Sequence, residues 1–191
     1  MARLDAYSRI VSGTPQFRIV ESGADEAPAY TFYTQANLDE DLKGVEPSGE
    51  TGTRVKTFDS VVTASAKDVV FSLLSGTAAV VQARHEGFLL TQNYVKLEPL
   101  QTVDPGYLAY VLNENRQVRH QLRREQQGSV TVKVTLRQLR NLELPLLPQI
   151  GKQKLIGELY ACQLKLDALR KKASELETVL VLEAIRKADE S

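Results

Sequence analysis

One narrow apolar stripe runs through the C-terminal part of the chain. Between residues 148 and 187, apolar positions recur at alternating spacings of four and three. The stripe consists of Leu155, Leu159, Cys162, Leu166, Leu169, Ala173, Leu176 and Leu180. This alternation predicts a helix with a coiled-coil seam, roughly 55 Å long at 1.5 Å per residue. The preceding residues could not cover such a helix, so we expect it to pair with a second long helix.

Residues 1 to 100 carry a different pattern, in which short apolar or β-branched runs alternate with turn residues. Such runs at close spacing are typical of strands in a β-rich domain with many turns. The segment 44–53 contains three glycines and a proline and is expected to be a loop. Strands are expected at 7–11, 17–20, 30–34, 55–57, 60–63, 69–73, 78–82 and 88–97.

Helical spacing begins at Asp104, which suits an N-cap, and Pro105, which suits the first helical residue. The helical period continues to Gln126, and Gly128 ends the segment. One helix is therefore expected between these positions.

A strand is expected at 130–134, followed by a short helix that a capping box of Thr135 and Gln138 opens. An extended segment, 142–148, then leads into the long helix. Together these patterns predict an α+β fold in two parts. Residues 1–147 form a mainly β domain with a few helices, and residues 148–191 form one long coiled-coil helix.

The composition is that of an ordinary water-soluble chain, with 42% hydrophobic and 25% charged residues among 191. No apolar run approaches the ~18 residues that a membrane span needs, and the first residues lack the apolar block of a signal peptide. The single cysteine, Cys162, excludes an internal disulfide. We therefore expect a cytoplasmic protein with no membrane contact.

The net charge is zero, but the charges are segregated along the chain. Residues 21–50 contain eight acidic residues and one basic residue, whereas residues 115–140 contain seven basic residues and one acidic residue. The basic stretch predicts a local field that attracts a polyanion. The acidic stretch argues against a polyanion crossing that surface, and either a solvated edge or a docking face for another subunit would explain it.

Motifs for covalent chemistry are absent from the sequence. His85 and His120 lie far apart, without the spacing of a metal pair, and Cys162 lies on the heptad seam. The sequence contains no glycine-rich nucleotide-binding motif and no Asn-Pro-Pro-Tyr-type methyltransferase motif. We expect no enzyme activity, no catalytic residue, no metal and no cofactor of its own.

The order of four residue groups resembles half of a type I restriction–modification specificity (S) subunit. The groups are 12–15 with 33–38; 90–95 with 107–112; 128–129 with Leu136, Leu139, Leu142 and 144–148; and Gln153 with Ile156. The resemblance extends over nearly the whole chain. It departs from the family in lacking a Trp after the first turn, and Gly151-Lys152 stands where a Glu often precedes the Gln.

The resemblance implies a non-catalytic subunit that recognises a sequence in double-stranded DNA. A full S subunit has two target-recognition domains and two long helices, whereas this chain has one of each, at 1–147 and 148–191. It implies a homodimer through antiparallel C-terminal helices, with a methyltransferase subunit, its S-adenosylmethionine and a restriction subunit as partners. The alternative is a coiled-coil assembly or inhibitory module without DNA recognition of its own.

DNA recognition needs cations for phosphates and paired donors and acceptors for base edges. Phosphate contacts are expected from a basic helix side and the strand after it, with Arg116, Arg119, Arg123, Arg124 and Lys133. Base readers are expected at strand ends and turns, with Arg54, Lys56, Lys67, Arg84, His85, Gln92 and Asn93. The alternative for the basic helix side is an ordinary solvated helix face, and for each base reader it is an ordinary surface or loop group, which is the commoner case.

Overall fold

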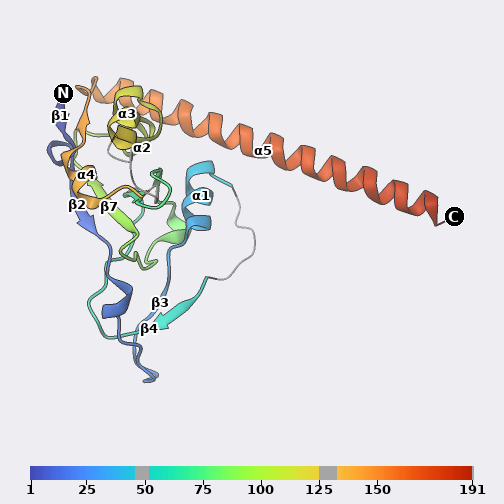
Figure 1. Ribbon diagram of the computed structural model, residues 1–191, viewed down its shortest axis with the longest axis horizontal. Helices are drawn as coiled ribbons and strands as arrows, with labels where there is room; N and C mark the ends of the chain where they lie inside the picture. Colours follow the sequence, from blue (N-terminus) through green and yellow to red (C-terminus); the bar gives the residue numbers. More distant parts are fainter. Residues whose placement is uncertain (46–51, 125–132, 191) are drawn as a thin grey trace.

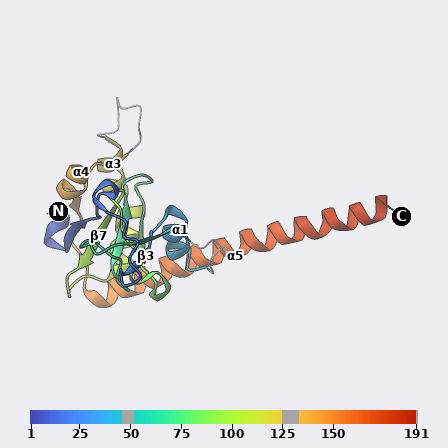
Figure 2. The same ribbon diagram turned by 90° about the horizontal axis from the view of Figure 1, so that it is seen from below.

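The computed structural model describes residues 1–45, 52–124 and 133–190. A compact head precedes one long helix, α5 (Ile150–Asp189), which leaves the head and projects away from it (Figure 1). Figure 2 gives the same arrangement from below, with most of the helix free of the head. No helix in the described ranges has both the length and the apolar character needed to cross a membrane.

The head is built around an antiparallel four-stranded sheet in the order β2-β7-β5-β6. Its strands are β2 (Ser8–Ser12), β5 (Val69–Ser72), β6 (Ala78–Val80) and β7 (Tyr94–Pro99). Val69 lies opposite Leu97 on one side and Val80 on the other. Two small antiparallel pairs flank this sheet, β1 (Ala2–Arg3) with β8 (Glu143–Leu144) and β3 (Ala29–Thr31) with β4 (Arg54–Lys56).

Both faces of the central sheet are covered, which explains why every residue of β5 is buried. Val69 and Phe71 belong to a core that α2 (Pro105–Glu114) covers. Val70 points to the opposite face, as the two-residue period of a strand requires, and packs in a second core beneath α1 (Gln35–Lys43). The head is therefore a helix–sheet–helix sandwich, and the predicted α+β class is confirmed.

Two predicted helix starts are confirmed by their caps. The Asp104 carboxylate accepts a hydrogen bond from Tyr107 N at the start of α2, with Pro105 in the first turn. Thr135 and Gln138 form the expected capping box at α4 (Leu136–Asn141).

The single helix expected from Asp104 to Gln126 was wrong, because the structure breaks it at Asn115. The Asn115 side-chain oxygen accepts from Gln117 N and Val118 N, and so opens a second helix, α3 (Arg116–Arg124). An Asn side chain competes in this way with the helical backbone. Residues 125–132 lie outside the described residues. They include the first three residues of the strand expected at 130–134, and the last two, 133 and 134, are not in a strand.

Helix α1 was missed, because its apolar content is low and its start was assigned to a strand and turn. Thr34 and Asn37 form a capping box there, and Gly44 ends the helix with φ 61°. The strand expected at 17–20 is instead a 3-10 turn, η2 (Gln16–Arg18), that follows Pro15. The segment expected as a strand at 60–63, and the first part of the one expected at 88–97, contain only isolated bridges, such as Thr63 with Leu89. The remaining 3-10 turns are η1 (Leu4–Ala6) and η3 (Ala83–His85).

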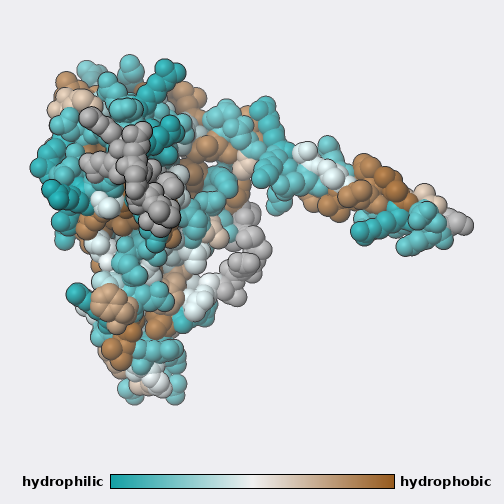
Figure 3. Space-filling model, viewed as in Figure 1, coloured by the Kyte–Doolittle hydropathy of each residue, from teal (hydrophilic) through white to brown (hydrophobic). Residues whose placement is uncertain are grey.

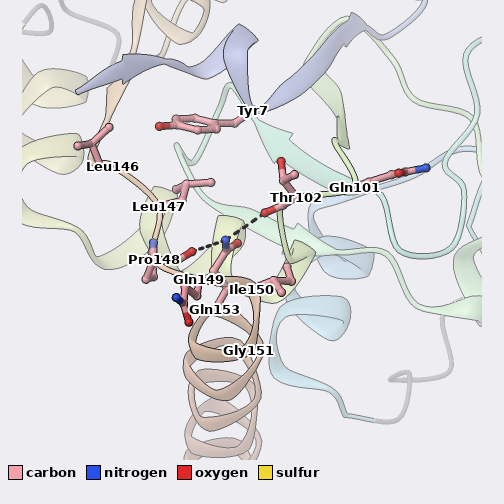
Figure 4. Close-up of a pocket in the computed structure, with 10 residues that line it drawn as sticks. All are labelled: Tyr7, Gln101, Thr102, Leu146, Leu147, Pro148, Gln149, Ile150, Gly151 and Gln153. Carbon is pink, nitrogen blue, oxygen red and sulfur yellow. Dashed lines mark hydrogen bonds between the residues drawn. The ribbon is translucent and has the colours of Figure 1, made fainter.

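The first turns of α5 are attached to the head through one buried glutamine. We call the part of α5 that projects beyond the head the rod. The Gln153 side chain is 2% exposed; its Oε1 accepts from Asp104 N at 3.0 Å, and its Nε2 donates to Thr102 O and Pro148 O (Figure 4). This amide therefore ties α5 to the segment that opens α2. An apolar pocket of about 820 Å³ lies beside it, lined by Tyr7, Leu146, Leu147 and Ile150 among others.

One turn later, α5 and α2 approach at two glycines. A Cβ on Gly157 would lie 2.7 Å from Asp104 Oδ1, 2.8 Å from Tyr107 N and 2.9 Å from Gly106 C. The contact then continues to Tyr160, whose hydroxyl bonds Asn113 Nδ2 and donates to a Glu114 carboxylate oxygen. The backbones touch because neither helix carries a side chain at the crossing point.

Candidate nucleic-acid interface

Helix α3 presents its basic side to solvent. Val118 and Leu122 are buried in the core, and Arg116 and Arg123 lie on the opposite, exposed side. The Gln121 amide bonds both Glu143 N (3.0 Å) and Glu143 O (2.8 Å), which fixes α3 against β8. A rigid helix therefore carries these two cations outward, as a phosphate contact requires.

Arg119 was also predicted to contact phosphate, but its side chain instead contacts the head. Its side chain is only partly exposed, and Nη1 donates to Gly76 O at 2.5 Å in the turn between β5 and β6. Lys133 is exposed, and its predicted phosphate contact stays a prediction. The Arg124 side chain lies outside the described part of the structure.

The exposed cations continue from α3 onto α4 and β1. Arg137 and Arg140 of α4 are exposed, and Arg3 of β1 donates to Arg140 O at 3.4 Å. Pairing of β1 with β8 brings the N-terminus to this place, where Asp5 also pairs with Arg3. Sequence reasoning counted Arg137 and Arg140 as part of a basic stretch without assigning them to the site. No sequence feature around Arg3 predicts a place on this surface, because only folding brings Arg3 next to Arg140.

Four predicted base readers lie in a second group of loops and strands. Arg54 and Lys56 are exposed on β4, where Lys56 pairs with Asp25 at 3.5 Å. Gln92 is exposed, and its Oε1 accepts from Gln16 N at 2.6 Å. Asn93 beside it is only partly exposed. In Figure 1, β4 lies at the end of the head remote from α5, whereas α3 lies beside the start of α5.

Lys67 is exposed in a tight turn, with φ 72°. Positive φ is unusual for a residue other than glycine, and it fixes the direction in which the backbone turns into β5. The structure therefore does not gather all the predicted DNA-binding residues on one surface.

His85 was wrongly assigned to DNA reading, because its side chain is buried in the head. The residue is 3% exposed, and Nδ1 lies 2.7 Å from Asp41 Oδ1. Tyr33 donates to the other Asp41 oxygen at 2.8 Å, and Asn37 Nδ2 lies 3.3 Å from His85 Nε2. Its neighbour Arg84 is partly buried and donates to Glu40 O. Both residues therefore anchor α1 to η3.

Burial raises the pKa values of two groups in this cluster, Asp41 and Tyr33. Burial raises the pKa of the Asp41 carboxyl, although hydrogen bonds from Tyr33 and His85 act in the opposite direction. Burial, followed by the charge of Asp41, also raises the pKa of the Tyr33 hydroxyl far above its usual range. Two members of the acidic stretch, Glu40 and Asp41, thus point into the head. Within the described ranges, no group of three or more His, Cys, Asp and Glu side chains could hold a metal ion.

The eight predicted seam residues of α5 are all exposed in the single chain. Exposure ranges from 41% at Leu166 to 70% at Leu180 among the leucines. Gln153, Gly157 and Tyr160 form the head-facing row, and on a helix of 3.6 residues per turn this row lies opposite the seam. In Figure 3 apolar atoms gather on the outer half of the projecting helix, and among the described residues nothing covers the seam leucines, which are all exposed.

The fold of the whole chain matches two solved structures. One is the HsdS subunit from Thermoanaerobacter tengcongensis, with a TM-score of 0.58 and 20% identity. The other, with a TM-score of 0.61 and 18% identity, comes from work on complex assembly and conformational transition of the type I R-M system. The matches cover 91% and 98% of this chain, but only 38% and 43% of those chains. No family profile matches the sequence, and no curated protein matches it either.

Proposed function

We propose that this chain is the DNA sequence-recognition subunit of a type I restriction–modification complex, in a half-length form. The observation that carries the proposal is the match of nearly the whole chain to less than half of each of two larger chains. A full S subunit of the family that the chain resembles has two target-recognition domains and two long helices, and this chain has one head and one rod. The chain itself performs no covalent chemistry, and its DNA contacts include Arg116 and Arg123 on α3.

Two copies pair through antiparallel α5 helices. The exposed seam, on the side of α5 opposite the head, supports this pairing, because both heads can remain in place while the seams meet. The apolar positions repeat as knobs-into-holes packing requires. The paired rods present two heads and bind a methyltransferase subunit, which supplies S-adenosylmethionine chemistry, and a restriction subunit.

The antiparallel register sets the distance between the heads. The seam is centred between Leu166 and Leu169, so the two Gly157 attachment points lie roughly 30 Å apart along the rod at 1.5 Å per residue. This separation is close to one turn of DNA, about 34 Å. The preferred target is therefore a two-fold symmetric sequence with two half-sites and an unread gap between them.

Coexpression with a type I methyltransferase subunit from the same genome tests this function. Sequencing of methylated bases in the host genome is expected to find one modified motif, with identical inverted half-sites centred on the order of 10 base pairs apart. An asymmetric motif would contradict identical paired heads. If the methyltransferase subunit copurifies but no motif is modified, the alternative of an assembly or inhibitory module replaces this proposal.

The exposed arginines of α3 are expected to contribute through phosphate contacts. Arg116→Gln together with Arg123→Gln should weaken duplex binding at least tenfold at low salt, because each lost phosphate contact releases one counterion fewer. The slope of log affinity against log salt concentration should fall in magnitude by about 1.8 for two contacts. Fluorescence anisotropy with labelled duplexes at several salt concentrations measures both quantities.

Lys171→Gln supplies the matched control for this variant, since it removes a cation from the exposed part of α5 beyond the head. It should leave both affinity and slope unchanged. Equal slopes for the wild type and the double variant would exclude α3 from the DNA contact.

A further inference from the structure

Two aromatic rings are displayed to solvent at the end of the head remote from α5. Phe17 of η2 is 82% exposed and Phe58, just after β4, is 65% exposed; Val20 beside them is 70% exposed. They account for two of the five phenylalanines of the chain. In Figure 3 apolar atoms gather on this end of the head. Grouped exposed apolar side chains of this size mark a contact surface.

These rings belong to loops that hydrogen bonds hold together. We call residues 16–20 and 57–59 the distal loops. Val20 N donates to Asp59 Oδ2 at 2.7 Å and joins one loop to the other, and Asp59 N donates to Thr57 Oγ1 at 3.0 Å. Gln16 N donates to Gln92 Oε1 at 2.6 Å and fixes η2 to the turn before β7. The rings are therefore presented by a preorganised backbone, which lowers the entropic cost of binding.

The groups around the rings suit a nucleic acid. The Arg18 guanidinium lies over the Phe17 ring, 5.7 Å from its centroid, so a cation accompanies an exposed aromatic face. Arg54 and Lys56 extend from β4, the strand before Phe58. Arg18 and Arg54 make no ion pair with the residues that the structure describes.

The acidic groups nearby restrict the direction of approach. Asp25 pairs with Lys56 at 3.5 Å but stays fully exposed, and Asp59 accepts the bond from Val20 N. Glu21 and Glu26 are exposed in the segment that follows Val20. A polyanion must therefore approach over Phe17, Arg18 and Phe58.

Pairing through α5 leaves this surface uncovered. In Figure 1 the distal loops lie at the end of the head away from α5. The seam lies on the side of α5 opposite the head-facing row. A second copy on the seam therefore cannot bury Phe17 or Phe58, and the occupant is a third component. The loops form a protrusion, which fits a groove better than a flat partner surface does.

We propose that the distal loops are an aromatic DNA contact, in which Phe17 and Phe58 press against base steps of the bound duplex. Apolar side chains that enter a groove in this way partly unstack the neighbouring bases. Arg18 holds the adjacent phosphate while the ring of Phe17 meets the bases. This assignment rests on the proposed DNA-recognition function and adds contacts that base-edge hydrogen bonding does not supply.

The test uses the purified full chain and a randomised duplex pool. Duplexes enriched by the wild type are synthesised with 2-aminopurine scanned through each position, and its fluorescence reports unstacking. Wild-type binding should raise the fluorescence at one or two steps in each half-site. Phe17→Ala with Phe58→Ala should abolish that rise and weaken binding about tenfold or more.

Leu100→Ala is the matched control, because it shortens another exposed apolar side chain of the head. It should change neither readout, and all variants should share the wild-type melting temperature. If the double Phe variant shows the affinity and the fluorescence rise of the wild type, the proposed aromatic contact is wrong, whereas DNA recognition still stands. If the double Phe variant binds DNA normally but no longer copurifies with the methyltransferase subunit, the loops are a protein docking surface and the aromatic DNA contact is also wrong. A wild type that enriches no duplex would refute DNA recognition itself.

Discussion

Replacing Leu166 and Leu169 with Asp is expected to convert the proposed dimer into monomers. In an antiparallel pair these residues flank the two-fold axis, so the substitution brings four carboxylates together at the centre of the seam. Each buried, unpaired carboxylate costs several kcal/mol, so the dimer dissociation constant should rise by at least about a thousandfold. Light scattering over a range of protein concentrations measures the change.

Lys171→Asp with Lys172→Asp is the control, since both residues are exposed and lie off the seam. It introduces the same two acidic residues and should leave the dimer intact. If the Leu166 and Leu169 variant remains dimeric, the heads rather than the rods hold the two copies together, and the pairing proposed here is wrong.

The only cysteine tests the direction of pairing. In the antiparallel register, Cys162 lies opposite Ala173 of the second copy, and the two Cys162 thiols lie roughly 16 Å apart along the rod at 1.5 Å per residue. Oxidation should therefore produce no covalent dimer from the wild type, whereas Ala173→Cys should produce one. A parallel pair would give the opposite result for the wild type, because both Cys162 thiols would lie at the same level.

Gly157→Val is expected to lower the free energy of unfolding by about 3 kcal/mol. A Cβ at this position would lie within 3 Å of Asp104 Oδ1, Tyr107 N and Gly106 C, of which the last two are backbone atoms that cannot turn aside. Helix α5 must therefore move off α2, and the buried hydrogen bonds of Gln153 are lost or strained. The melting temperature should fall by about 6–12 °C for a chain of this size.

Gly151→Ala provides a control of opposite sign in the same helix. Nothing lies within 4 Å of the added Cβ, so the substitution should stabilise the chain by up to about 0.5 kcal/mol through the helix preference of Ala. Urea unfolding followed by circular dichroism compares the two variants. A Gly157→Val chain as stable as the wild type would mean that α5 is not packed on α2 through this crossing.

The parts of the fold that depend on local chemistry could be predicted from the sequence. The caps at Asp104 and Thr135 use side chains within three residues of the groups they bind, and the α5 heptads repeat a local period. Helix α1 could have been found from Thr34 and Asn37, which form the same kind of capping box. Its weak apolar pattern concealed it, because Glu40 and Asp41 face inward.

The candidate site was less predictable, because long-range contacts decide which polar side chains remain available. His85 is removed from the surface by Asp41, 44 residues earlier in the chain, and Arg119 is engaged by Gly76, 43 residues earlier. Arg3 joins the basic surface only because β1 pairs with β8 near the other end of the head. The strand expected at 17–20 was wrong for a similar reason, since Phe17, Ile19 and Val20 favour a strand when their environment is not known.

Opposite sides of α5 serve the head and the seam. The row with Gln153 and Gly157 packs on the head, whereas the leucines of the seam are exposed in the single chain, and Cys162 of the seam lines a pocket beside α1. A different head could therefore be grafted ahead of the same rod, with new sequence preference and unchanged oligomerisation. Diversification of the reading surface by recombination would then leave the architecture of the assembly intact.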